Sequence, residues 1–249
     1  MAAGARGETG VSNHRATMAA RVEDAGSLDY FPSPPWWGRA LGEALERLGL
    51  PIRHVLSGDC EEPAAGEGHL AHGLADVFGR VLASDIADYP PRPGAAPIVM
   101  QDYLHPERTP SSRAPWWAEL PAWTATNPPF GDRTEPFVRK AYARSLIGAA
   151  MLLQLRLLEG KGRHQLFREC GLYATVVMPR KGSGLRKGVW VPGQSTATAY
   201  AWFIFVKPDV VPGWNGFDGE ARQLWIEPNA AARLTRDSDM AFAGLKAAA

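Results

Sequence analysis

Short apolar runs alternate with helix-like segments along most of this chain, and that alternation restricts the fold more than any other feature. The runs lie at 55–62, 80–85, 96–102, 122–126, 148–158, 172–179 and 199–207. Helical patterns lie between some of them, notably at 70–79 and 135–146. Strands that alternate with helices form a parallel sheet wrapped by helices. We therefore predict an α/β fold.

A further helix is predicted near the N-terminus. Pro34 and Pro35 precede an apolar periodic run that ends near Gly49, and proline at the start with glycine at the end is typical of a helix. Residues 1–27 have few large apolar side chains, so we predict a disordered tail there.

Size and composition fit one α/β domain. The chain has 249 residues, 45% of them hydrophobic, and we place the domain at 28–235 with a C-terminal tail at 236–249. Lys and Arg total 27 against 26 for Asp and Glu, so any nucleic-acid surface would be a local patch.

The expected environment follows from what the sequence lacks. Cys60 and Cys170 cannot build a disulfide framework. The sequence contains no CxxC motif that would indicate a metal site. No apolar run approaches the roughly 18 residues of a membrane helix, and the N-terminus lacks the apolar region of a signal peptide. We expect a cytoplasmic monomer or weak dimer without a metal.

The first candidate ligand site follows the first strand, in EPAAGEGH (62–69). Ligands of open α/β sheets lie beyond the carboxyl ends of the strands, and Gly66 and Gly68 would let one approach the backbone closely. The GxGxxG and GxxxxGKS phosphate loops are absent. The Glu62 carboxylate would repel phosphate and suits an ammonium group.

Two further acids end the next two strands. Asp85 lies 17 positions after Gly68, where an acid accepts hydrogen bonds from ribose hydroxyls. Asp102 in QDYL could accept from an adenine amino group. An ammonium, a ribose and an adenine together describe S-adenosylmethionine, which we predict as the cofactor.

A stiff corner, TNPPFGD (126–132), follows the fourth strand. Its two prolines remove two backbone donors and fix two φ angles, and Asn127 is pushed away from the α region because it precedes a proline. The corner presents one amide, some free carbonyls and the aromatic Phe130. Taken alone, Asn-Pro-Pro is also typical of a turn or a polyproline segment.

In this order the motifs resemble class I amino-methyltransferases that act on exocyclic amines, chiefly DNA N6-adenine and N4-cytosine methyltransferases. The matching stretches are YFPSPPW (30–36), EPAAGEGH (62–69), ASDI (83–86), QDYL (101–104) and TNPPF (126–130). Their order resembles the gamma arrangement, and LRLLEGKGRHQLF and AYAWFIFVK are similar to parts of compact phage or prophage adenine methylases. The resemblance covers roughly residues 28–228. It implies a Rossmann-like, seven-stranded, mostly parallel sheet with helices on both faces.

The resemblance also implies roles for these motifs. The N-terminal segment would contact the methionine end of S-adenosylmethionine, and the NPPF motif is the catalytic signature. Implied cofactor-binding residues are Phe31, Ser33, Pro34, Glu62, Ala64, Gly66, Gly68, Asp85, Ile86, Asp102 and Tyr103. Implied catalytic residues are Asn127, Pro128, Pro129 and Phe130.

The corner suits the chemistry of an exocyclic amine, a poor nucleophile because its lone pair is delocalised into the ring. The Asn127 side-chain oxygen and the Pro128 carbonyl could accept the amine hydrogens and favour a more tetrahedral nitrogen, in a geometry that the prolines preorganise. Phe130 would stack on the base, which is worth roughly 1–3 kcal/mol, after the base is flipped out of the duplex. Methyl transfer would be direct, without a covalent enzyme intermediate or a metal.

A basic stretch, RKGSGLRKG (180–188), is predicted to be a flexible loop. Its Arg180, Lys181, Arg186 and Lys187 could contact DNA phosphates or could form only a solvated loop. No separate target-recognition domain follows the core, so the DNA target sequence stays open.

Other readings stay open as well. A methyltransferase of this fold could act on RNA or on the glutamine amide of a release factor, although those glutamine enzymes usually carry Tyr where this chain has Phe130. A non-catalytic binding protein is disfavoured by the complete cofactor motifs. Packing explains Trp36, Trp37, Trp116 and Trp117 better than base stacking does. For His69 and His72 a cap or surface position is favoured over catalysis.

Overall fold

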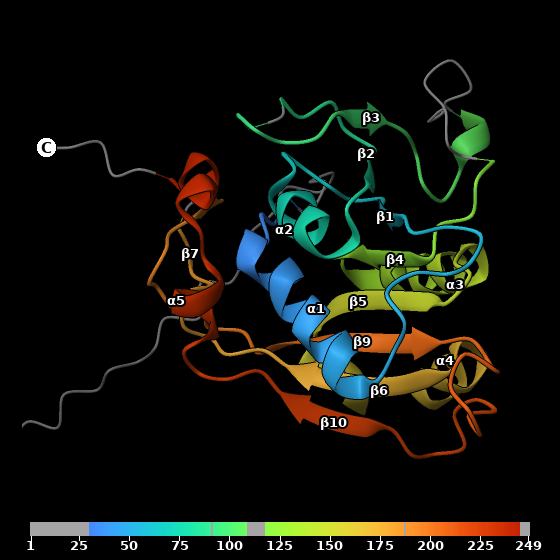
Figure 1. The fold of residues 1–249 in the computed structure, drawn as a ribbon. Helices are drawn as coiled ribbons and strands as arrows, with labels where there is room; N and C mark the ends of the chain where they lie inside the picture. Colours follow the sequence, from blue (N-terminus) through green and yellow to red (C-terminus); the bar gives the residue numbers. More distant parts are fainter. Residues whose placement is uncertain (1–29, 91, 109–117, 187, 245–249) are drawn as a thin grey trace, which may run out of the picture.

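The computed structural model describes residues 30–90, 92–108, 118–186 and 188–244. Its main sheet consists of β1 (Cys60–Glu62), β2 (Val81–Asp85), β3 (Ile98–Met100), β4 (Trp123–Thr126), β5 (Gly148–Gln154), β6 (Leu172–Val177), β9 (Tyr200–Val206) and β10 (Arg222–Trp225). The spatial order is β10-β6-β9-β5-β4-β1-β2-β3 (Figure 1). Only β9 is antiparallel to its neighbours, β5 and β6. The prediction of a Rossmann-like, mostly parallel α/β sheet is confirmed.

The sheet has eight strands where seven were predicted. The additional strand is β10, which pairs in parallel with β6 at the edge of the sheet. Its side chains are exposed or half-buried. A strand at an edge can form through backbone hydrogen bonds without a buried apolar run, so the apolar pattern of the sequence did not predict it.

One strand boundary also differs. The apolar run 148–158 was predicted to be a single strand, but β5 ends at Gln154 and the chain continues as a 3-10 helix, Leu155–Glu159. An apolar run fixes neither the period nor the end of an element.

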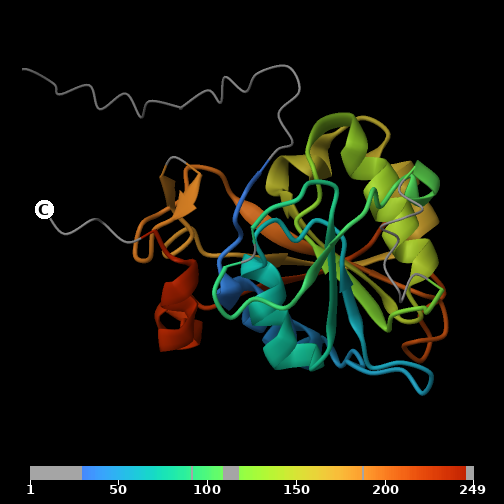
Figure 2. The ribbon, with the colours of Figure 1, turned by 90° about the horizontal axis from the view of Figure 1, so that it is seen from above.

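Helices cover both faces of the sheet, as predicted. Figure 2 shows α1 (Pro35–Leu48, blue) and α2 (His69–Phe78, teal) on one face, and α3 (Thr134–Arg144, yellow-green) with α4 (Arg163–Cys170) on the other. Helix α1 starts at Pro35 and ends at Leu48, and Gly49 with φ +70° is its C-cap residue, so the predicted proline start and the end near Gly49 are confirmed.

A glycine permits the close contact between α1 and α2. A Cβ atom on Gly73 of α2 would lie 1.8 Å from the Pro35 carbonyl oxygen. Any larger residue would therefore push the start of α1 away from α2 and from the sheet ends beside it.

The packed chain continues beyond residue 235, where a C-terminal tail was predicted. After α5 (Ala230–Leu234), a 3-10 helix spans Asp237–Phe242, and Asp239 and Phe242 are fully buried. Asp239 is held by an ion pair to Arg39 of α1. The predicted tail 1–27 and residues 245–249 lie outside the described residues. Within the described parts of the chain, no helix is long and apolar enough to cross a membrane.

Candidate functional site

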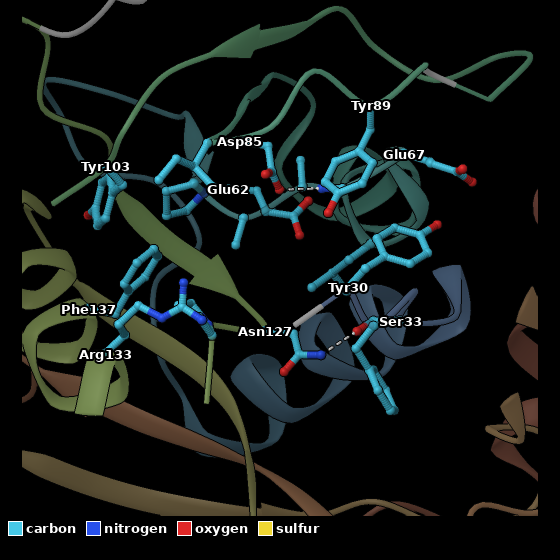
Figure 3. Close-up of a pocket in the computed structure, with 18 of the residues that line it drawn as sticks. Tyr30, Ser33, Glu62, Glu67, Asp85, Tyr89, Tyr103, Asn127, Arg133 and Phe137 are labelled. Carbon is cyan, nitrogen blue, oxygen red and sulfur yellow. Dashed lines mark hydrogen bonds between the residues drawn. The ribbon is translucent and has the colours of Figure 1, made fainter. Parts of the chain in front are cut away.

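A pocket of about 350 Å³ lies beyond the carboxyl ends of the first four strands of the sheet (Figure 3). Eleven residues from five separate stretches of the sequence analysis line it. They are Phe31, Ser33, Glu62, Ala64, Gly66, Asp85, Ile86, Asp102, Tyr103, Asn127 and Pro129. The parallel strands bring these stretches together because their carboxyl ends share one edge of the sheet.

Four other candidate residues do not line this pocket: Pro34, Gly68, Pro128 and Phe130. Pro34 is the N-cap residue of α1, and its carbonyl accepts a hydrogen bond from the Trp37 N–H at 3.0 Å. Gly68 precedes α2 with φ +90°, and a Cβ there would lie 2.9 Å from the Ala95 Cβ. Both positions shape the helix starts beside the pocket.

The loop after β1 is held by Asp85 and covered by an aromatic ring. Asp85 accepts hydrogen bonds from the Gly66 N–H at 2.8 Å and from the Ala87 N–H at 3.0 Å, one on each carboxylate oxygen. Gly66 has φ +55°, and a Cβ there would lie 3.1 Å from the Tyr30 ring. A carboxylate oxygen can accept more than one hydrogen bond, so Asp85 can also accept from a ligand.

Two buried carboxyl groups face one pocket. Glu62 is 1% exposed, and its Oε2 has no hydrogen-bond partner among the described residues. Burial, and then the nearby Asp85, raise the pKa of Glu62 well above its ordinary value. Burial also raises the pKa of Asp85, against the lowering effect of the Ala87 and Gly66 N–H groups.

A cationic ligand would lower the electrostatic cost of keeping these two buried carboxyl groups ionised. An opposite charge nearby stabilises the carboxylate form that burial disfavours. The orphaned Glu62 oxygen therefore fits the ammonium group of S-adenosylmethionine. In the described parts of the chain, no group of three or more His, Cys, Asp or Glu is placed to hold a metal ion.

The amide of Asn127 is held from one side only. Asn127 follows the end of β4, and its Nδ2 donates to the Ser33 Oγ at 3.0 Å, as Figure 3 shows. Its Oδ1 is buried and has no partner within the described part of the chain. The Thr134 hydroxyl donates to the Pro129 carbonyl at 2.9 Å and so ties the corner to the start of α3.

Phe130 lies beside a second cavity. This cavity measures about 240 Å³ and is also lined by Gln154, Arg156 and Arg163. The Phe130 ring meets Phe31 edge to face, with ring centroids 6.2 Å apart. The corner thus separates the two cavities, with Asn127 and Pro129 on one side and Phe130 on the other.

Several pocket residues were not identified from the sequence. They are Tyr30, Pro32, Pro63, Ala65, Glu67, Leu70, Tyr89, Leu104, His105, Arg133 and Phe137. Tyr30 and Tyr89 pack together with ring centroids 5.0 Å apart. Tyr30 directly precedes Phe31 in the quoted YFPSPPW, so adjacency could have suggested it, whereas Tyr89 and Phe137 lie in no motif.

The basic stretch 180–188 is anchored, where a flexible loop was predicted. The Gly182 carbonyl accepts hydrogen bonds from the Trp36 and Trp190 indoles, and the Ser183 hydroxyl accepts one from the Trp37 indole. Two short strands, β7 (Leu185–Arg186) and β8 (Val189–Trp190), pair antiparallel. The packing role predicted for Trp36 and Trp37 is confirmed, since both are fully buried.

The structure describes only some of the four basic candidate residues. Arg180 and Lys181 are exposed, and Lys181 borders a cavity of about 620 Å³ beside the C-terminal segment. Only the backbone of Arg186 is described, and Lys187 lies outside the described residues, as do Trp116 and Trp117.

His69 is buried, contrary to the predicted cap or surface position. Its Nε2 lies 3.0 Å from the Phe242 carbonyl oxygen of the C-terminal segment. Burial lowers the pKa of His69 to about 4. The contact to Phe242 explains the difference, because residues 236–249 were predicted to be a tail.

No family model and no curated protein matches the chain. Solved structures do match. A putative class I S-adenosylmethionine-dependent methyltransferase from Listeria monocytogenes aligns with a TM-score of 0.53 and 13% identity, over 86% of this chain and 70% of that one. The DrdV–DNA complex aligns with a TM-score of 0.55 and 13% identity, over 84% of this chain and 29% of that one.

The ATP-dependent Type ISP restriction-modification enzyme LlaBIII bound to DNA aligns with a TM-score of 0.53 and 12% identity, over 84% of this chain and 21% of that one. This chain therefore spans less than a third of either DNA-bound enzyme. At such identities the likeness concerns the fold, and the protein has the class I methyltransferase fold.

Proposed function

We propose that the protein is an S-adenosylmethionine-dependent methyltransferase that methylates the exocyclic amine of a base in DNA, with N6 of adenine as the preferred target. The observation that carries the proposal is the Asn127 amide, whose Nδ2 is bound to Ser33 while Oδ1 is buried without a partner among the described residues. A buried acceptor without a donor costs about 1–3 kcal/mol. An amine N–H that reached Oδ1 would remove that cost.

The acidic wall of the pocket would hold the cofactor. Glu62 would pair with the ammonium group, and Asp85 would accept from the ribose hydroxyls. Asp102, whose Oδ1 accepts from the Leu104 and His105 N–H groups, would face the adenine. When bound, the cofactor would supply an electrophilic methyl group to the amine nitrogen; S-adenosylhomocysteine would be the leaving group, and the amine would lose one proton to solvent.

The corner would activate the amine. Asn127 Oδ1 and the Pro128 carbonyl would accept hydrogen bonds from its two N–H groups. These bonds would localise the lone pair on the nitrogen. The two prolines and the Thr134 bond to the Pro129 carbonyl keep these acceptors fixed, so little ordering is required during the reaction. Phe130 would support a flipped base from the side of the second cavity.

DNA is proposed as the substrate for two reasons. The DNA-bound enzymes DrdV and LlaBIII each contain a region with this fold. Arg180 and Lys181 are exposed on the anchored basic stretch, where, with Arg186 and Lys187, they would contact phosphates.

The free thiols of Cys60 and Cys170 are both buried, which suits the reducing cytoplasm.

The test is transfer of labelled methyl groups from S-adenosylmethionine to DNA by the wild-type protein, with Asn127→Ala as the control. Digestion of the DNA to nucleosides then separates N6-methyladenine from N4-methylcytosine. Release-factor protein and RNA are assayed in parallel. If RNA or release-factor protein is labelled and DNA never is, the methylation chemistry is supported but DNA is the wrong substrate.

A further inference from the structure

Asn127 has one side-chain partner that stands out, and it comes from a distant part of the sequence. The Ser33 hydroxyl lies 3.0 Å from Asn127 Nδ2, across 94 positions of the chain. Ser33 is 3% exposed and Asn127 is 9% exposed, so water does not compete freely for this bond. Both residues also line the pocket.

The two ends of an asparagine amide have opposite hydrogen-bonding character. Oδ1 accepts and Nδ2 donates, so a rotation by about 180° would present N–H groups to the substrate amine in place of an acceptor. The corner prolines restrict the backbone at this position, but they do not fix the rotation of the side-chain amide. A bond to Nδ2 can fix it.

We propose that Ser33 is the positioning residue for Asn127, since its hydroxyl oxygen retains Nδ2 and thereby keeps Oδ1 turned toward the substrate amine. This inference rests on the proposed function.

Removal of the hydroxyl gives the first expectation. In Ser33→Ala, Nδ2 loses its buried acceptor, and the amide gains by turning Nδ2 toward the pocket. We expect kcat for methyl transfer to fall at least tenfold. Ser33→Thr keeps the hydroxyl and should recover most of this loss.

A double-mutant cycle separates positioning from other roles. A residue that acts only through Asn127 has nothing left to do once Asn127 is removed, so the two effects should not add. Ser33→Ala combined with Asn127→Ala should be no slower than Asn127→Ala alone. A purely structural or cofactor-binding role for Ser33 would add its full loss in the double variant.

The control is Ser145→Ala. Ser145 is also a buried serine whose hydroxyl is hydrogen-bonded to another side chain, the Thr124 hydroxyl at 2.9 Å, but it lies outside the pocket. We expect this variant to lose stability to urea without a tenfold loss of kcat. Calorimetric titration with S-adenosylmethionine reports whether each variant still binds cofactor.

The outcomes distinguish the two proposals. A wild-type protein that methylates DNA, with a tenfold loss in Ser33→Ala, recovery in Ser33→Thr and no added loss in the double variant, supports the inference. Wild-type activity with an unchanged kcat in Ser33→Ala, or with additive losses, overturns the inference alone. An inactive, cofactor-binding wild-type protein overturns the proposed function and the inference with it.

Discussion

Arg39 and Asp239 form a buried two-pronged ion pair that joins the first helix to the C-terminal segment. Arg39 Nη1 donates to Oδ2 at 2.7 Å and Nη2 donates to Oδ1 at 2.8 Å. The side chains are 5% and 0% exposed. The pair holds the last described turn against α1, which places Phe242 over His69 at the start of α2.

Loss of one partner should strongly destabilise the protein. In Asp239→Ala, Arg39 keeps its bond to Asp76, but its buried positive charge is only partly compensated. Removing one partner of a buried ion pair typically lowers the free energy of unfolding by about 3–5 kcal/mol. Urea denaturation measures the free energy of unfolding. The control is Glu43→Ala, which breaks a largely exposed pair with Arg233 and should cost less than about 1 kcal/mol. Equal losses of the free energy of unfolding in both variants would mean that the buried pair contributes no more to stability than the Glu43–Arg233 pair.

Cofactor binding should depend on Asp85. Asp85→Ala removes an acceptor for ribose hydroxyls and also releases the Gly66 and Ala87 N–H groups. We expect the affinity for S-adenosylmethionine to fall tenfold or more, on the order of 1.4 kcal/mol. Calorimetric titration measures it, and Asp88→Ala is the control, since Asp88 is an exposed acid three positions away. An unchanged affinity in folded Asp85→Ala protein would remove this residue from the site.

The raised pKa of Glu62 predicts proton release when a cationic ligand binds. Below that raised pKa the free protein carries protonated Glu62, whereas the ammonium of S-adenosylmethionine pairs with the carboxylate. Affinity should therefore rise with pH until the raised pKa is passed. Titrations in buffers of different ionisation enthalpy count the protons released. In Glu62→Gln we expect less proton release and weaker binding.

The same shift gives the sign of an effect on stability. The folded form holds the Glu62 proton more tightly than the unfolded chain does, so this group's contribution to stability is present below its ordinary pKa and is lost as pH rises through the raised one. Without ligand, Glu62→Gln should thus be more stable than wild type at neutral pH. Urea titrations across pH measure the difference, and a less stable variant would contradict this account.

The structure brings together candidate residues that the sequence placed at strand ends. Glu62, Asp85 and Asn127 each follow a short apolar run, and parallel strands must bring their carboxyl ends to one edge. Tyr89 and Phe137 reach the pocket from a connecting segment and from α3, whose spatial position no local pattern fixes. The C-terminal segment is held by Asp239 and Phe242, single residues whose partners lie far away in the sequence. Local periodicity predicts elements, whereas contacts of this kind depend on the completed fold.

DNA binding should depend on the basic stretch. Replacement of Arg180, Lys181, Arg186 and Lys187 with Ala should weaken DNA binding and flatten its salt dependence, because fewer counterions are released from the phosphates. Fluorescence anisotropy at several salt concentrations measures the slope. Arg168→Ala on α4 is a control for the loss of an exposed cation elsewhere. The same slope in the fourfold variant would mean that DNA binds at another surface.

Substitutions in the corner should separate loss of methyl transfer, in Asn127→Ala, from loss of base binding, in Phe130→Ala. Asn127→Ala leaves both prolines and Phe130 in place, so cofactor affinity should stay nearly unchanged while most methyl transfer is lost with Oδ1. Phe130→Ala should weaken capture of the flipped base, by roughly the 1–3 kcal/mol that stacking on an aromatic ring contributes. Phe130→Tyr and Phe130→Trp keep an aromatic face beside the second cavity and should retain part of the activity. Methyl-transfer rates measured beside cofactor titrations reveal the split. If Asn127→Ala methylates at the wild-type rate, the corner is only a turn, and methylation of an amine is the wrong function for this site.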